Sequence, residues 1–284
     1  MAIAVNTLIQ QARRFARDYP EIDATTASIA SNGTTLSVAD TTIYARNWNL
    51  QLDTESVEVA SIASATTLTI RRAAQGTTAA SHASAATILV RPAYLDIEYL
   101  DALNYAQDQT YPYIYREVDD TSLTTLANTY EYTIPTDSVT AKPIRGIYRV
   151  QLKISGTFDY RATRSWTVLR GTTPKIQFRH EPIVGANIRI HGYGYFADLA
   201  FGGNVDTKFP EEAANTLLIG AVEYLAGSGE MGRIRVDTGV IDAREQANRP
   251  SAALSLSNAY LSRFERSLLK HAMPPLPKNV QRTI

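Results

Sequence analysis

Apolar residues recur at helical spacing at both ends of this chain and alternate with polar residues through much of its middle. The clearest helical stretch is residues 208–229, KFPEEAANTLLIGAVEYLAGSG, whose apolar face consists of Leu217, Leu218, Ala221, Val222 and Leu225. Pro210 suits the first helical position because its nitrogen carries no hydrogen, and the acidic pair after it opposes the positive end of the helix dipole. Gly227 and Gly229 are typical of a helix end.

Three further stretches have the same kind of apolar stripe. Near the N-terminus the stripe is Val5, Leu8, Ile9, Ala12, Phe15, Ala16 and Tyr19, and Pro20 follows it. Residues 93–115 predict another helix that ends near Pro112, and residues 251–272 predict the last one. Because each stripe has to be buried, we predict a bundle of about four helices built from residues 1–21, 93–118 and 203–273.

The segments between these helices predict β structure. Residues 22–92 are rich in Ala, Thr, Ser and Val, with short alternating runs at 35–40, 50–59, 66–72 and 86–92. Residues 119–202 contain runs with the same alternation at 130–135, 144–154, 165–171, 175–182 and 186–196. The predicted fold class is therefore α+β: a helical bundle that carries two inserted antiparallel β domains, a small barrel or sandwich at 22–92 and a second sandwich at 119–202.

Composition narrows the classes of function. The chain of 284 residues predicts one or two domains. With no cysteine it has no disulfide, thiolate metal site or cysteine nucleophile. Its 28 basic residues balance 28 acidic ones, which is unlike the basic footprint of most nucleic-acid-binding proteins. No apolar run approaches the roughly 20 residues of a membrane-spanning helix, and the N-terminal residues do not match a secretory signal, so we expect no membrane partner and assembly in the cytosol.

Motifs that would carry chemistry are absent or misplaced. The glycines at 227, 229 and 232 spell G-x-G-x-x-G, but they follow a helix rather than a strand, which favours a helix end. No two of the four histidines, His82, His180, His191 and His271, have metal-ligand spacing, so we expect polar side chains at a surface or interface. The adjacent acids at 119–120 and 211–212 fit a turn and a helix start. We therefore expect no enzyme activity, catalytic residue, metal or cofactor.

Two groups of polar or aromatic residues leave alternatives open. Arg13, Arg14 and Arg17 would form a local basic face, although on an amphipathic helix such charges are more often the solvated side. Among the sixteen tyrosines, those at 111, 113 and 115 and at 193 and 195 would stack on sugars, lie in a protein interface, or be ordinary half-buried strand residues.

One motif in the first β region resembles a known module. A strand containing Glu55 and Val59 is followed by the strand TLTI and then by R-x-x-x-G-T-x-A-x-x-H from Arg72 to His82. This pattern is similar to a small β module of many tailed-phage structural proteins. The sequence departs from that module at Ala73 and Ala85, where glycines are common.

The order of the predicted elements resembles that of a protein family. Helix, β insertion, helix, β-sandwich, helix, connector, helix and tail is the layout of the head-to-tail connector, or adaptor, proteins of tailed bacteriophages. The stretches FPEEAANTLLIGAVEYLAG, YEYTIPTDS and IRGIYRV are similar to theirs. The resemblance implies a structural virion protein at the neck between head and tail: a ring, usually of twelve copies, beneath the portal protein, in contact with tail or neck components, with genomic DNA passing through the lumen.

The same resemblance implies a role for the extended C-terminal tail, residues 274–284, with Met273 before it. The segment that would dock on the portal comprises Met273, Pro274, Pro275, Leu276, Pro277, Lys278, Asn279, Val280, Gln281, Arg282, Thr283 and Ile284. Proline-rich segments stay extended and lose little entropy on docking, although a frayed terminus without function is the alternative. The competing functional hypothesis is a receptor-binding or carbohydrate-binding virion protein, typically a trimer, which particle symmetry distinguishes from a ring.

Overall fold

The computed structural model describes residues 3–153, 160–163, 165–227, 250–274 and 281–282. The chain divides into two compact units. Unit 1 comprises Met1–Asn6, Asn104–Gly220 and Leu261–Ile284, and unit 2 comprises Thr7–Leu103 and Ala221–Tyr260.

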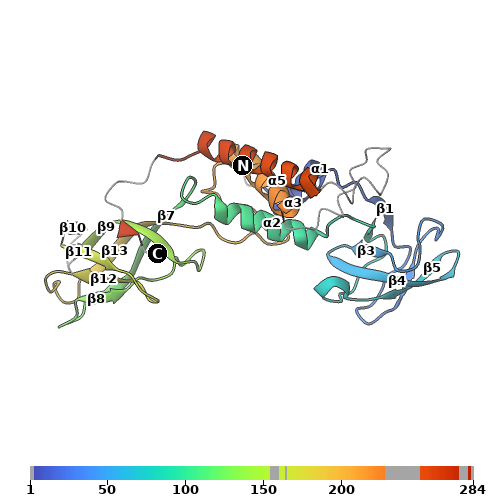
Figure 1. Ribbon diagram of the computed structural model, residues 1–284. Helices are drawn as coiled ribbons and strands as arrows, with labels where there is room; N and C mark the ends of the chain where they lie inside the picture. The colour runs from blue at the N-terminus through green and yellow to red at the C-terminus, as the bar shows by residue number, and fades with distance from the viewer. Residues whose placement is uncertain (1–2, 154–159, 164, 228–249, 275–280, 283–284) are drawn as a thin grey trace. The chain divides into compact units, whose positions relative to one another are not determined.

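The described residues contain four α-helices, in the four regions where the sequence predicts helices (Figure 1). The helices are α1 (Val5–Phe15), α2 (Asp96–Gln109), α3 (Ala214–Gly227) and α5 (Pro250–Lys270). The division into units falls within these helices, so their assembly into one bundle stays a prediction.

Helix α1 ends earlier than its apolar stripe predicts. Arg17 has a left-handed backbone with a φ of 55°, and Tyr19 is 74% exposed rather than part of the buried face. Arg13, predicted on the solvated side, is 4% exposed: it forms ion pairs with Asp18 and Asp96, the second at 2.8 Å. Arg13 is therefore not part of the predicted exposed basic face, because Asp18 after α1 and Asp96 at the start of α2 pair with its guanidinium group.

The start of the third helical region also differs from the prediction. A short 3-10 turn, η2 (Glu211–Ala213), precedes α3, and Pro210 lies before the turn with an extended backbone rather than in its first position. The buried face is the predicted one, since Leu217, Leu218 and Ala221 are at most 4% exposed. Gly227 ends α3, while Gly229 and the rest of the connector at 228–249 lie outside the described residues.

The first β region forms one six-stranded antiparallel sheet in unit 2, with strand order β1-β6-β3-β4-β5-β2. Its strands are β1 (Glu21–Ala24), β2 (Thr35–Ser37), β3 (Asn49–Leu52), β4 (Glu55–Ser64), β5 (Thr67–Arg71) and β6 (Thr87–Val90). A single apolar cluster from β2 to β6 and the segments between them is buried, including Leu36, Leu50 and Leu68 at 0% exposure. One sheet encloses this core, so the sheet curls around it.

Two details of this sheet correct the sequence prediction. Residues 50–59 are not one strand but the hairpin of β3 and β4, and Asp53 makes the turn between them with a φ of 52°. Strand β1, which falls outside the predicted runs, pairs with β6 through Glu21 and Val90. Its side chains are mostly exposed, and an exposed strand lacks the apolar alternation on which the prediction depends.

The second β region, in unit 1, consists of two antiparallel sheets with a shared core. One sheet has the order β10-β9-β13-β7, with β14 on the edge of β9, and the other has the order β11-β12-β8. Their strands are β7 (Arg116–Thr124), β8 (Glu131–Thr133), β9 (Ile144–Lys153), β10 (Arg161–Thr163), β11 (Trp166–Leu169), β12 (Lys175–Phe178), β13 (Asn187–Gly194) and β14 (Gln281–Arg282). Ile147 and Ile188 from the first sheet and Ile176 from the second are each 0% exposed in one cluster.

Strand β7 overlaps a region that the sequence assigns to the helical bundle. Arg116 and Val118 lie in the strand, and Asp119 and Asp120 do too, rather than in a turn. Asp119 accepts hydrogen bonds from Arg189 on β13, with Nε 2.8 Å from its Oδ1. Helix α2 ends at Gln109, where the chain turns through residues 110–114, and β7 begins at Arg116.

Helices α2, α3 and α5 meet within unit 1 at a glycine. A Cβ added to Gly220 of α3 would lie 2.6 Å from the ring of Phe264 on α5 and 2.8 Å from the Cβ of Ala106 on α2. Nearby, the hydroxyls of Thr216 and Ser267 are 2.6 Å apart. The missing side chain at Gly220 is what lets Phe264, 6% exposed, fill this space.

Candidate functional site

The predicted docking segment begins at the end of α5 and is held by its own unit. The N–H of Met273 donates to the carbonyl of Tyr113 at 2.8 Å, and the hydroxyl of Tyr115 donates to the carbonyl of Pro274 at 2.9 Å. Further along, Gln281 and Arg282 form β14, which pairs with β9. The remaining members of the predicted set, Pro275 to Val280 with Thr283 and Ile284, lie outside the described residues.

The edge of β9 receives this strand at two residues. Gln281 faces Ile147 and Arg282 faces Gly146 in an antiparallel register. Strand β10 pairs with β9 further along, at Val150, Gln151 and Leu152. Strand β13 pairs with the other edge of β9. The sequence predicts an extended tail, and the resemblance implies that it docks on the portal. Pairing partners in a sheet are nonlocal, so the sequence contains no signal for this one.

The tyrosines considered for sugar stacking instead pack largely on one another. Tyr115 and Tyr193 are 4% and 5% exposed, with ring centroids 4.4 Å apart, and Tyr148 stacks on Tyr193 at 4.8 Å. Burial, with the nearby Tyr115, Tyr148 and Glu117 adding to it, raises the pKa of Tyr193 to about 12. Tyr111 contacts Tyr195 edge to face. The faces of Tyr115 and Tyr193 are therefore used inside the protein. Tyr193 lies in β13, as in the interpretation that these are strand tyrosines, whereas Tyr115 precedes β7 and Tyr113 is 42% exposed.

A buried ion network lies under the motif from Arg72 to His82. Arg72 donates from Nε to Oε1 of Glu55 at 2.7 Å and from Nη2 to Oε2 at 2.6 Å. Backbone N–H groups of Ala73 and Ala80 donate to the same carboxylate, at 3.0 and 3.1 Å. Burial acts to raise the pKa of Glu55, but these hydrogen bonds outweigh it and lower the pKa to about 2. The carboxylate is thus ionised and fully paired.

His82 completes this network, which corrects its predicted position on a surface or interface. The residue is 5% exposed, with Nδ1 2.8 Å from Asp53 and Nε2 2.9 Å from Glu55. Each nitrogen of the ring therefore faces a carboxylate oxygen. Of the other histidines, His180 is exposed and His191 is 2.7 Å from the side-chain oxygen of Gln151.

The rest of the motif shapes the loop over Glu55. Thr77 accepts a hydrogen bond from the N–H of Ser56 at 3.0 Å and donates to the carbonyl of Ala74 at 2.9 Å. Ala73 and Ala85, where the resembling modules often have glycine, both have left-handed backbones, with φ values of 52° and 62°. Arg72, Thr77 and His82 thus hold the loop on the sheet.

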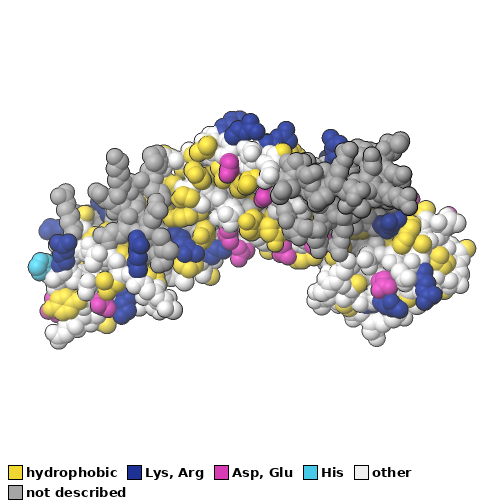
Figure 2. Space-filling view, viewed as in Figure 1, with side chains coloured by type: hydrophobic (Ala, Val, Ile, Leu, Met, Phe, Trp, Pro, Cys, Tyr) yellow, Lys and Arg dark blue, Asp and Glu magenta, His cyan; other side chains and the backbone are white. Residues whose placement is uncertain are grey.

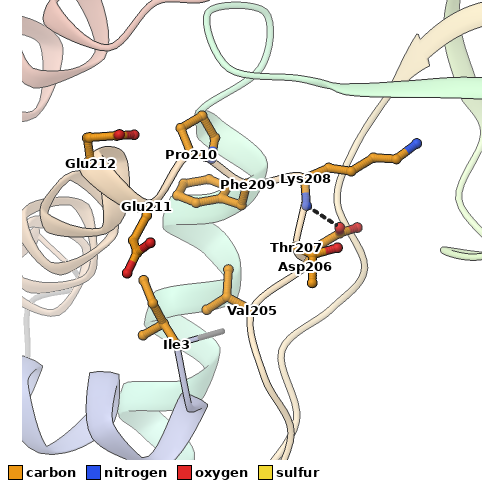
Figure 3. A pocket seen from close by; sticks show the side chains of 9 residues that line it. All are labelled: Ile3, Val205, Asp206, Thr207, Lys208, Phe209, Pro210, Glu211 and Glu212. Carbon is orange, nitrogen blue, oxygen red and sulfur yellow. Dashed lines mark hydrogen bonds between the residues drawn. The ribbon is translucent and has the colours of Figure 1, made fainter. Parts of the chain in front are cut away.

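Unit 1 has a pocket of about 310 Å³ beside the start of α3. It is lined by Ile3, Val205, Asp206, Thr207, Lys208, Phe209, Pro210, Glu211 and Glu212 (Figure 3). The backbone N–H of Lys208 donates to Asp206 at 2.8 Å, and the other oxygen of Asp206 accepts from Arg116 at 2.9 Å. Arg116 also pairs with the buried Asp137. These bonds make the carboxylate of Asp206 a link between the loop before α3 and β7.

Two other kinds of site are not found in the described residues. Across that part of the chain, no three His, Asp or Glu side chains come together as a metal site would require. None of its helices is both long and apolar enough to cross a bilayer.

Comparison with known proteins finds a weakly similar structure. No protein-family model matches the chain, and no curated protein matches it. A chain of a solved structure described as "Neck of empty GTA particle computed with C6 symmetry" is similar to it, with 15% sequence identity, over 50% of this chain and 78% of that chain, at a TM-score of 0.24. A likeness at this level does not establish a common fold and carries no inference about function.

Proposed function

We propose that this chain is a structural virion protein, the head-to-tail adaptor of a tailed bacteriophage-like particle. Copies form a ring beneath the portal at the neck, join it to tail or neck components and let the genome pass. The protein is assembled in the host cytoplasm and is not an enzyme.

The observation that carries the proposal is the order of the elements. Helices in the regions of α1, α2, α3 and α5 alternate with two antiparallel β regions, and a C-terminal segment follows the last helix. This order supports the resemblance to the adaptor family. The motif that resembles the phage module adds support, because its Arg72 and His82 meet at Glu55 to hold a compact β fold rather than to form a site.

Ring formation is compatible with the charge of the chain. Side-by-side copies make a heterologous contact, which closes into a ring when the rotation fits. DNA in the lumen must not be bound tightly, and tight phosphate binding requires clustered Lys and Arg. The net charge is zero, and Figure 2 shows basic and acidic side chains interspersed on the face drawn.

The C-terminal segment from Met273 to Ile284 is the proposed portal contact. Deletion of residues 274–284 is expected to leave a folded protein, since the buried apolar cluster of the second β region consists of residues before the tail, and to abolish binding to the purified portal. The control is the unchanged melting temperature and circular dichroism of the truncated chain. Undiminished portal binding by the truncated chain contradicts the docking role.

Electron microscopy of the chain with its portal tests the ring. We expect one closed ring of about twelve copies on the portal axis. A trimer away from that axis would instead favour the receptor-binding or carbohydrate-binding alternative.

A further inference from the structure

The C-terminal segment has a binding site on its own chain. Strand β9 presents an edge at which Gly146 and Ile147 lie opposite Arg282 and Gln281 in an antiparallel pair. An unpaired edge is a template for an added strand, so an extended peptide is the ligand that such a site takes. In this structure the peptide on the edge is the chain's own β14.

The start of the same segment is also held on unit 1, so β14 is tethered close to the edge that it pairs with. Pro274, held by the Tyr115 hydroxyl, is seven residues before Gln281. Seven residues span at most about 25 Å, so β14 stays near β9 at a high effective concentration. Two residue pairs can then hold a strand that would not bind as a separate peptide.

Strands β9 and β13 pack closely beside the edge that receives β14. A Cβ added to Gly192 on β13 would lie 2.7 Å from the carbonyl oxygen of Gly146. Glycine at position 192 therefore lets β13 approach β9 closely on the side away from β14. The paired stretch of β9 is held in place by its neighbour, whereas β14 is held by backbone pairing at the free edge.

We propose that the β9 edge at Gly146 and Ile147 stores the C-terminal segment in the free protein, and that β14 must leave this edge before the segment docks on the portal. The second half rests on the proposed function. The physical reason is that one set of backbone N–H and C=O groups cannot pair with β9 and with a partner's strand or groove at the same time. Storage also covers an edge that would otherwise recruit a strand from another molecule.

A disulfide lock tests the proposal, and the chain suits it because it has no native cysteine. Facing residues in an antiparallel pair have Cα atoms about 4.5–5.5 Å apart, within the range that a disulfide bridges. The double variant Gly146→Cys/Arg282→Cys is expected to oxidise to a monomer with an internal disulfide. Its portal binding should then be at least tenfold weaker and should return when the disulfide is reduced.

The same protein under reducing conditions is the matched control, and the single variant Gly146→Cys shows whether β9 tolerates the cysteine. Equal portal binding by the oxidised and reduced forms overturns the release step. Failure of the cysteines to pair in a folded chain overturns storage. Disulfide-linked dimers in place of monomers would place β14 on the β9 of a second copy and overturn storage within one chain.

Hydrogen exchange on the unmodified protein gives a second test that needs no variant. Consecutive residues of a strand bond to opposite neighbours, so one of the Gly146 and Ile147 amides faces β14. When portal is added, exchange at that amide should become faster, because β14 leaves, while the C-terminal segment remains protected by the portal. Exchange at β9 that stays unchanged while the portal binds contradicts release. If the unmodified chain does not bind portal at all, it is the proposed docking function that fails, and the release step fails with it.

Discussion

Arg72 and Glu55 form a two-point ion pair inside the first β region, with Nε and Nη2 at 2.7 and 2.6 Å from the two carboxylate oxygens. The side chains are 8% and 1% exposed. A pair of this geometry is specific for Arg, because its planar fork matches a carboxylate. The pair joins the strand that begins at Glu55 to the loop that ends at His82.

Removing the charge of Glu55 should therefore destabilise unit 2. Glu55→Gln leaves Arg72 and His82 without their shared partner, and breaking a buried pair on one side costs about 3–5 kcal/mol. The matched control is Glu58→Gln, whose partner Arg71 is 64% exposed and whose loss should cost less than about 1 kcal/mol. Urea unfolding measures both; equal losses of stability would contradict the role of Glu55.

Lowering the pH should remove the contribution of Glu55 to the stability of unit 2. The pKa of Glu55 is lowered from 4.5 to about 2 in the folded chain, so its contribution is complete above pH 4.5 and is lost as the pH falls toward 2. Because each tenfold change in proton affinity corresponds to about 1.4 kcal/mol, the contribution is on the order of 3 kcal/mol. The stability difference between the native chain and Glu55→Gln should therefore shrink over this pH range. A difference that stays constant from pH 6 to pH 2 would exclude this linkage.

Gly220 should not tolerate even one added methyl group. Gly220→Ala improves helix propensity by up to about 1 kcal/mol, but the new Cβ would lie within 3 Å of Phe264 and Ala106. We expect a net loss of about 1–3 kcal/mol from overpacking, seen as a lower melting temperature. Gly171→Ala, where no atom lies within 4 Å of the added Cβ, is the control and should change stability by less than about 0.5 kcal/mol. A neutral Gly220→Ala would mean that the three helices have room to separate.

The substitutions Ala73→Gly and Ala85→Gly should each stabilise the first β region. Both backbones are left-handed, a conformation that costs a residue with a Cβ about 1–2 kcal/mol and glycine much less. Glycine loses more entropy on folding, which offsets about 0.5–1 kcal/mol. We expect each substitution to add up to about 1 kcal/mol in thermal unfolding. Ala79→Gly, at a residue without a left-handed backbone, should be destabilising; a similar effect at all three positions would contradict the argument.

Local sequence patterns identify the helical regions, the two β regions and their order along the chain. The stripe of Leu217, Leu218 and Ala221 is buried as predicted, because helical periodicity is a local property that a short window of residues reveals. The alternation in residues 186–196 likewise identifies β13. The ends of the elements are predicted less accurately. The left-handed residue Arg17 ends α1 before Tyr19, and nothing in the apolar stripe indicates this end.

Which distant residues meet became known from the folded chain alone. Glu55 is 17 residues from Arg72 and 27 from His82, and the pattern that the sequence shows becomes a buried ion network only when the sheet brings the three together. The partner of the C-terminal segment is more remote still, since Arg282 lies opposite Gly146 in a strand pair, and strand pairing uses backbone groups that nearly all residues share. Side-chain patterns report which face is apolar, whereas strand pairing uses the backbone, which is why the fold was needed to show where the segment lies.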